Sequence, residues 1–148
     1  MRKVIFLLIT FLCLPNTLWA ADPVIGAWKL NVEKSTLPHK ELTEVYKEIG
    51  KDQIELTRTG HGDGFKFQND KYTFPRQGGV CEFNGRRIGV EVKVSDGEWY
   101  AVNFDDEKEE WWIIHKMISE DGKTMYTEHK RFEPQGDLVV EKGVFDRQ

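Results

Sequence analysis

The side chains with the clearest chemical potential are the histidines and the acidic groups near them. Imidazole and carboxylate ligands suit zinc or copper. The candidate ligands for such a metal are His115, His129, His61 and Asp63. No His-x-His or His-x3-His spacing occurs among them. The segment His61-Gly62-Asp63-Gly64 has the composition of a glycine-rich turn. The sequence therefore predicts no metal site.

Nucleophilic catalysis would need a cysteine or serine beside a base. The pairs that would serve are Cys81 with a histidine, or Ser35 or Ser95 with a histidine and an aspartate. The sequence contains no nucleophile elbow, HExxH helix or glycine-rich phosphate loop. It therefore predicts no catalytic residue, no cofactor and no enzyme activity, and Cys81 is expected to be a small buried apolar side chain.

The first twenty residues have the pattern of an export signal. Arg2 and Lys3 precede an apolar run from Val4 to Leu14, and small residues follow at the expected cleavage point after Ala20. The run is shorter than the roughly 20 apolar residues that span a bilayer. The sequence predicts a signal peptide over residues 1–20, a periplasmic or secreted protein, and no membrane anchor.

Residues 21–148 then form one domain, since no Pro-, Gly- or Ser-rich linker divides them. Loss of Arg2 and Lys3 with the signal changes the formal net charge from −4 to −6, because no acidic residue leaves. An acidic chain without a basic stripe argues against nucleic acid as a partner. Cys81 is the single cysteine of this domain, so no internal disulfide is expected.

Short stretches of β-branched and aromatic residues recur about every ten residues with turn signals between them, which is typical of an all-β protein. One segment is ambiguous, because Leu42 to Ile49 fits helical spacing as well as strand alternation. The other predicted strands form a meander of hairpins: Val24 to Val32, Gln53 to Thr59, Gly64 to Phe67, Lys71 to Phe74, Arg87 to Val94, Glu98 to Phe104, Trp111 to Ile118, Thr124 to Phe132 and Leu138 to Phe145.

Turn lengths predict the register of the C-terminal hairpins. Ser95-Asp96-Gly97 and Glu120-Asp121-Gly122 fit three-residue loops, and Asp105 to Lys108 fits a four-residue turn. These loops predict an inward face made of Val90, Val92, Val94, Tyr100, Val102, Phe104, Trp111, Ile113, His115, Met117, Met125, Thr127, His129 and Arg131. They predict a solvent face with Arg87, Glu91, Lys93, Lys116, Glu128 and Lys130.

Three segments in the right order resemble secreted bacterial lipocalin-like proteins. They are Gly26-Ala27-Trp28-Lys29-Leu30-Asn31 with Glu33-Lys34-Ser35, then Tyr72-Thr73-Phe74-Pro75 with Gly78, then Ser119-Glu120-Asp121-Gly122-Lys123-Thr124-Met125. The resemblance implies a single antiparallel meander closed into a barrel of about eight to ten strands. It also implies that Leu42 to Ile49 is a strand.

Gly26 and Trp28 are predicted to be structural, with Arg131 or Arg147 stacked on the indole of Trp28 at one end of the barrel. Small barrels either fill their interior or enclose one ligand. The predicted function is therefore a binding module that holds a small, largely apolar ligand, with a carboxylate for Arg131 to meet, in or at the mouth of the barrel. The predicted ligand-binding residues are Tyr100, Trp111, His115, Met117, His129 and Arg131.

Two alternatives remain open. One is a packed structural or interaction barrel that uses exposed Trp99 and Trp112 and the acidic loop from Asp105 to Glu110 against a partner. The other is a carbohydrate binder that stacks sugars on Trp99 and Trp112. The oligomeric state is not predicted.

Overall fold

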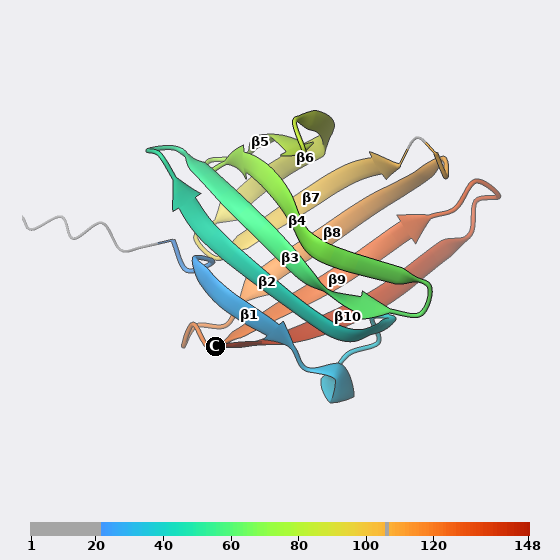
Figure 1. Cartoon of the computed structure of the whole chain (residues 1–148), viewed down its shortest axis with the longest axis horizontal. Coiled ribbons are helices and arrows are strands. Elements are labelled where there is room, and N and C mark those ends of the chain that lie inside the picture. Colours follow the sequence, from blue (N-terminus) through green and yellow to red (C-terminus); the bar gives the residue numbers. More distant parts are fainter. Residues whose placement is uncertain (1–21, 106) are drawn as a thin grey trace, which may run out of the picture.

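The computed structural model describes residues 22–105 and 107–148 of the 148-residue chain. The predicted signal peptide lies outside the described residues. Ten antiparallel strands follow one another around a closed barrel, in which β1 pairs with β10 (Figure 1). The strands are β1 Gly26–Leu30, β2 His39–Ile49, β3 Gln53–Gly62, β4 Phe65–Pro75, β5 Gly79–Phe83, β6 Arg86–Ser95, β7 Glu98–Asp105, β8 Glu110–Ile118, β9 Thr124–Phe132 and β10 Leu138–Arg147. The predicted all-β meander is confirmed.

The strand pattern differs from the prediction in the middle of the chain. Leu42 to Ile49 lies within β2, as the family resemblance implies and the helical spacing does not. The two short strands expected at Gly64 to Phe67 and Lys71 to Phe74 are parts of β4, which is continuous because a bulge opposite Arg58 and Thr59 absorbs the irregularity. Strand β5 was missed, because its glycines and short length hide the alternation.

The helical content of the described residues is one short 3-10 turn, η1 (Val32–Lys34), between β1 and β2. None of the helices described is long and apolar enough to cross a membrane.

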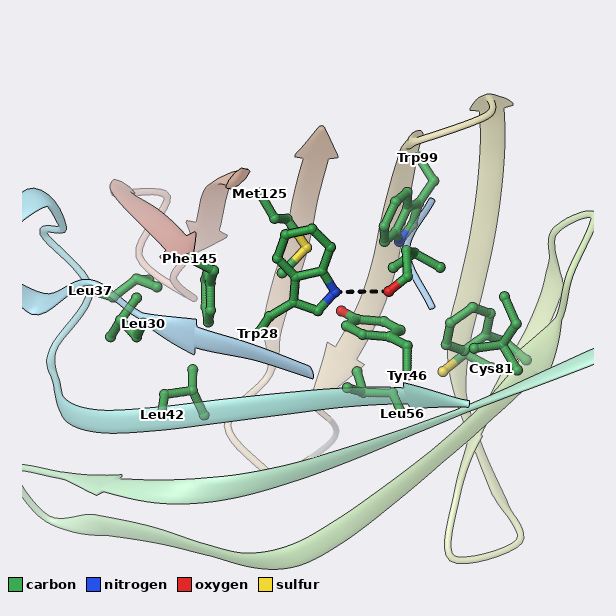
Figure 2. Packing of buried hydrophobic residues seen from close by; sticks show 13 residues of the cluster. Trp28, Leu30, Leu37, Leu42, Tyr46, Leu56, Cys81, Trp99, Met125 and Phe145 are labelled. Atoms are coloured by element: carbon green, nitrogen blue, oxygen red, sulfur yellow. Dashed lines mark hydrogen bonds between the residues drawn. The ribbon is translucent and has the colours of Figure 1, made fainter. Parts of the chain in front are cut away.

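One end of the barrel is closed by a packed apolar core around Trp28, whose side chain is completely buried. Its indole Nε1 donates a hydrogen bond of 2.8 Å to the carbonyl of Val24, and Tyr46, Met125 and Phe145 surround it (Figure 2). The guanidinium of Arg147 stacks on the indole 4.3 Å from the ring centroid and donates to the carbonyls of residues 23, 25 and 122. Of the two arginines predicted to stack on Trp28, the one in contact with the indole is Arg147.

Gly26 lies beside this closing pair. Its φ of +137° is a conformation that L side chains rarely adopt, and an added Cβ would lie 3.0 Å from Nη1 of Arg147. The position therefore favours glycine for both conformational and steric reasons.

The predicted orientation of β6, β7 and β8 is wrong, although the residues predicted to share a face do share one. Val92 pairs with Tyr100, and Tyr100 pairs with His115, as expected. That shared face points to solvent, because Trp111 is 51% exposed whereas Lys116 is 3% exposed. Glu91 and Lys116, predicted to be solvated, are therefore inside the barrel.

The cause is the turn between β8 and β9. Ser119 donates its backbone N–H to the carbonyl of Thr124 at 2.8 Å, so four residues form the loop where three were predicted. The side chain of Asp121 stabilises the longer loop by accepting from the backbone N–H of Lys123 and the hydroxyl of Ser119. One extra residue moves the pairing from Trp111–Arg131 to Trp112–Arg131, which inverts every side chain of β8 relative to β9.

Candidate functional site

The centre of the barrel holds charged side chains rather than a purely apolar core. Glu44 on β2 lies directly opposite Arg58 on β3, and both side chains point inward. Nε of Arg58 donates to Oε1 of Glu44 at 2.8 Å, and Nη2 contacts the same oxygen at 2.7 Å. We call Glu44, Tyr46, Arg58, Glu91 and Lys116 the inner cluster.

Tyr46 and Lys116 complete the bonding around Glu44. The hydroxyl of Tyr46 donates to Oε2 of Glu44 at 2.6 Å and accepts from Nζ of Lys116 at 2.6 Å. The ammonium of Lys116 also lies 3.6 Å from Oε2 of Glu44 and 5.2 Å from the centre of the Tyr46 ring. The charges of Glu44, Arg58 and Lys116 therefore each have a partner, as buried charges require.

The surroundings set the protonation states. Burial by itself would raise the pKa of Glu44, but Lys116, Arg58 and the hydrogen bonds from Tyr46 and Arg58 hold it well below its usual range. Burial would lower the pKa of Arg58, yet Glu44 raises it above its ordinary value. Burial, together with the charge of Glu44, raises the pKa of the Tyr46 hydroxyl. The group is a carboxylate held by two cations and a neutral phenol.

Glu91 on β6 is the member of the inner cluster whose carboxyl group still has an oxygen able to bond. Its carboxyl is 8% exposed, and Oε2 has no hydrogen-bond partner among the described residues. Burial raises its pKa to about 7, with Glu44 adding to the rise and Lys116 opposing it. With Glu91 protonated, Arg58, Lys116 and Glu44 leave the cluster one positive charge in excess.

The neighbours of Glu91 are equally enclosed. The indole Nε1 of Trp99 is buried without a partner among the described residues. The two residues line a pocket of about 20 Å³, enough for about one water molecule. Burial raises the pKa of the Cys81 thiol to about 12, so the thiol stays protonated, and its buried position is the one predicted.

A second group of polar side chains lies toward the opposite end of the barrel from Trp28. Trp112 on β8 lies between its cross-strand neighbours Asn103 on β7 and Arg131 on β9. Glu110 lies two residues before Trp112 on β8. We call these four residues the mouth cluster. The guanidinium of Arg131 lies 5.3 Å from the centre of the Trp112 ring and 3.2 Å from Oε1 of Glu133.

The mouth cluster presents both donors and acceptors. Nε of Arg131, Oδ1 of Asn103 and Oε2 of Glu110 are buried and have no hydrogen-bond partner among the described residues. Nδ1 of His39, on the other side of the barrel, shares this property. Buried polar atoms ordinarily find a partner, and those that do not mark places where a ligand or water can bond.

Of the predicted ligand-binding residues, His129 and Arg131 lie inside the barrel. His129 is buried, and its burial, with Arg58 and Lys116, lowers its pKa to about 3. The imidazole is therefore neutral near pH 7. Contact between these two residues and a ligand stays a prediction.

The lumenal position predicted for Tyr100, Trp111, His115 and Met117 is wrong, because all four lie on the outer side of β7 and β8. Tyr100 and His115 stack with ring centroids 4.3 Å apart, and Nε2 of His115 lies 2.9 Å from Oε1 of Glu98. His115 and Met117 also border an open groove of about 330 Å³. This groove is open, whereas the buried polar atoms without hydrogen-bond partners lie inside, so we place the candidate site inside the barrel.

The exposure expected for Trp99 is also wrong, because this residue is 7% exposed and belongs to the core. Trp112 is partly buried and faces the lumen opposite Arg131. The exposed pair of indoles needed for the proposed carbohydrate surface is therefore absent from these two positions.

No family model and no curated protein matches the chain. Solved structures do match it. Apo lipid binding protein 8 of Caenorhabditis elegans has a TM-score of 0.55 and 13% identity, over 87% of this chain and 98% of that one. The bradavidin2–biotin complex has a TM-score of 0.47 and 17% identity, over 85% and 98% of the two chains. The chain shares the closed antiparallel barrel of the lipid binding protein. This likeness agrees with the predicted lipocalin-like barrel.

Sequence reasoning missed Glu44, Arg58 and Lys116. The first two fall on alternating positions of β2 and β3, where Leu42, Tyr46 and Leu56 mark the inward face. With β2 assigned as a strand, that alternation predicts that Glu44 and Arg58 point into the barrel. The signal for Lys116 was its position between Ile114 and Ile118, which a correct turn length would have shown to face inward.

Proposed function

We propose that this barrel is a binding module for a small ligand, held at the mouth cluster with one end directed toward the inner cluster. The observation that carries the proposal is the set of buried, unpartnered polar atoms on Arg131, Asn103 and Glu110, which lie on neighbouring strands around the indole of Trp112. Such atoms are costly to bury unless something bonds to them.

The charges favour a neutral ligand over a carboxylate at the mouth. Arg131 lies near Glu110 at 4.0 Å and near Glu133 at 3.2 Å, so its charge is already balanced. Arg131 offers a donor, whereas Asn103 and Glu110 offer acceptors. The complementary molecule is largely apolar, has a flat ring to stack on Trp112, and carries both a donor and an acceptor.

We also propose that the protein is exported from the cytoplasm. The basic start and apolar run of residues 1–20 support export to the periplasm or the outside of the cell. N-terminal sequencing of the protein recovered from its own host tests this step, and a mature chain beginning at Ala21 is the expected result.

The binding experiment uses two aromatic probes of similar size. Neutral phenylnaphthylamine should gain fluorescence with the purified protein, and anionic anilinonaphthalene sulfonate should bind more weakly. Arg131→Met removes the donor and keeps the bulk, and Asn103→Leu removes an acceptor, so both should lower the affinity for the neutral probe. Arg86→Met, at an exposed position of β6, is the matched control and should leave the affinity unchanged.

Native mass spectrometry of protein from its own host then looks for a retained small molecule. Unchanged probe affinity in both mouth variants, with both variants folded, would contradict the site. A retained molecule carrying a carboxylate would contradict the preference for a neutral ligand and leave the site in place.

A further inference from the structure

The outer side of β6, β7 and β8 is an apolar surface. Its strands present alternate residues to solvent, and the central ones carry no acidic or basic group, because Glu98 and His115, which are bonded to each other, lie toward one end of β7 and β8. We call it the apolar face, and it consists of Val90, Val92, Val94, Tyr100, Val102, Phe104, Trp111, Ile113 and Met117.

The apolar face is continuous across the strands. Val90, Val102 and Ile113 are direct cross-strand neighbours in one row. Phe104 and Trp111 pair in another row, which continues through Phe132 on β9 to Leu138 on β10. Val94 is 56% exposed and Val92 49%. Surfaces of this kind, contiguous and apolar, mark interaction sites.

We propose that the apolar face packs against the same face of a second copy of this chain, giving a two-fold symmetric dimer. Each of β6, β7 and β8 is paired with a strand on both sides, so contact through this part of the sheet must be face to face. A face whose centre carries no charge is complementary to itself, as a two-fold interface requires. A charged partner would find no group at the centre of this face to bind.

The size of the face agrees with a dimer. Strands lie about 4.8 Å apart and rise about 3.4 Å per residue, so five strands of eight residues cover roughly 600 Å² of sheet. The side chains add relief to this area, and a stable interface buries about 800 Å² of accessible surface on each partner. On β9 this area includes Glu128 and Lys130, which are bonded to each other at 2.9 Å, so the apolar face with its extension through Phe132 and Leu138 supplies most of the area of a standard interface rather than all of it.

The neighbouring charges disfavour a membrane as the occupant. Glu107 and Glu109 are exposed in the loop immediately before Glu110 and Trp111. Anionic lipid headgroups attract basic segments and repel acidic ones. The acidic edge of the face therefore suits a second protein surface better than an anionic bilayer.

The test is the mass of the purified protein by sedimentation equilibrium at micromolar concentration. The expected result is a dimer, and Val92→Lys and Trp111→Lys should each weaken it by at least about tenfold in dissociation constant, since each places a charge in an apolar contact. Gln53→Lys, on an exposed position of β3, adds the same charge outside the face and should leave the dimer intact.

A cross-linking experiment locates the contact independently. Val92→Cys should give a covalent dimer under mild oxidation, whereas Gln53→Cys should not. A wild-type monomer over this concentration range overturns the proposal. A dimer that withstands both lysine variants overturns it too, because the contact then lies elsewhere. Sedimentation of the monomer with phosphatidylcholine vesicles would assign the face to a membrane and would likewise overturn it.

Discussion

The two sides of this barrel distribute polarity in opposite ways. The outer side of β2, β3 and β4 is polar and includes an ion pair between Lys71 and Glu55 at 3.1 Å, as expected of a solvated sheet face. The outer side of β6, β7 and β8 is apolar, while Glu91 and Lys116 from the same strands are buried. Alternation along a strand therefore shows which residues share a face, but not which face is inside.

The interior explains how the barrel tolerates buried charges on β6 and β8. Lys116 on β8, the side with the apolar outer surface, reaches across the lumen to Tyr46 and Glu44 on β2, the side with the polar outer surface. Each side supplies charge that the other needs, so the charges of the inner cluster are satisfied only when the barrel is closed. Three changes distinguish the two sides: loss of the buried charge of Arg58, titration of Glu91, and substitution of Val92 on the apolar face.

The largest expected effect comes from breaking the buried pair. Arg58→Met should lower the free energy of unfolding by about 3–5 kcal/mol, because it leaves the carboxylate of Glu44 buried with fewer partners. Lys71→Met breaks an ion pair at the surface and should cost less than about 1 kcal/mol. Urea unfolding of both variants measures the contrast. Equal losses would show that the inner cluster is no more important to stability than a surface pair.

The second effect concerns pH. The pKa of Glu91 is raised from 4.5 to about 7, so the folded protein holds a proton that the unfolded chain releases. Its stabilising contribution is therefore full below pH 4.5 and is lost as the pH rises through about 7. Glu91→Gln, which stays neutral, should be more stable than the wild type by roughly 3 kcal/mol at about pH 8 and similar to it at about pH 4.

Two histidines, the buried His129 and the partly buried His39, act in the opposite direction and must be kept constant in this comparison. Burial lowers the pKa of His39 to about 4 and that of His129 to about 3, so both lose stabilisation as the pH falls below their unfolded value of 6.5. The difference between Glu91→Gln and the wild type isolates the glutamate. A difference that does not change with pH would show that Glu91 is ionised in the folded state.

The smallest expected effect is on the apolar face. Val92→Thr should change the unfolding free energy of the separated chain by less than about 0.5 kcal/mol, because half of this side chain is already in water. Denaturation in dilute solution measures it. A loss of several times that size would show that the outer side of β6 is covered within a single chain.

The fold could be predicted because its evidence is local and repeated. Regular alternation and turn signals indicate a meander, and Gly26, Trp28 and the segment from Leu42 to Ile49 were placed correctly with the help of the family resemblance. The candidate site was predicted only in part. His129 and Arg131 were placed inside because the phase of β9 was right, whereas Tyr100 and Trp111 were misplaced with the strands before the misjudged turn.

The sequence by itself determined most of the strands, the meander, and the sets of residues that share a face on β6, β7 and β8. These follow from the two-residue period of a strand and from the conformations that glycine and aspartate favour in turns. Only the tertiary structure decided which face of β6, β7 and β8 is inside. A single extra residue between Ser119 and Thr124 inverts that choice. The buried charges become acceptable only when Glu44 and Arg58 arrive from strands more than fifty residues away from Lys116.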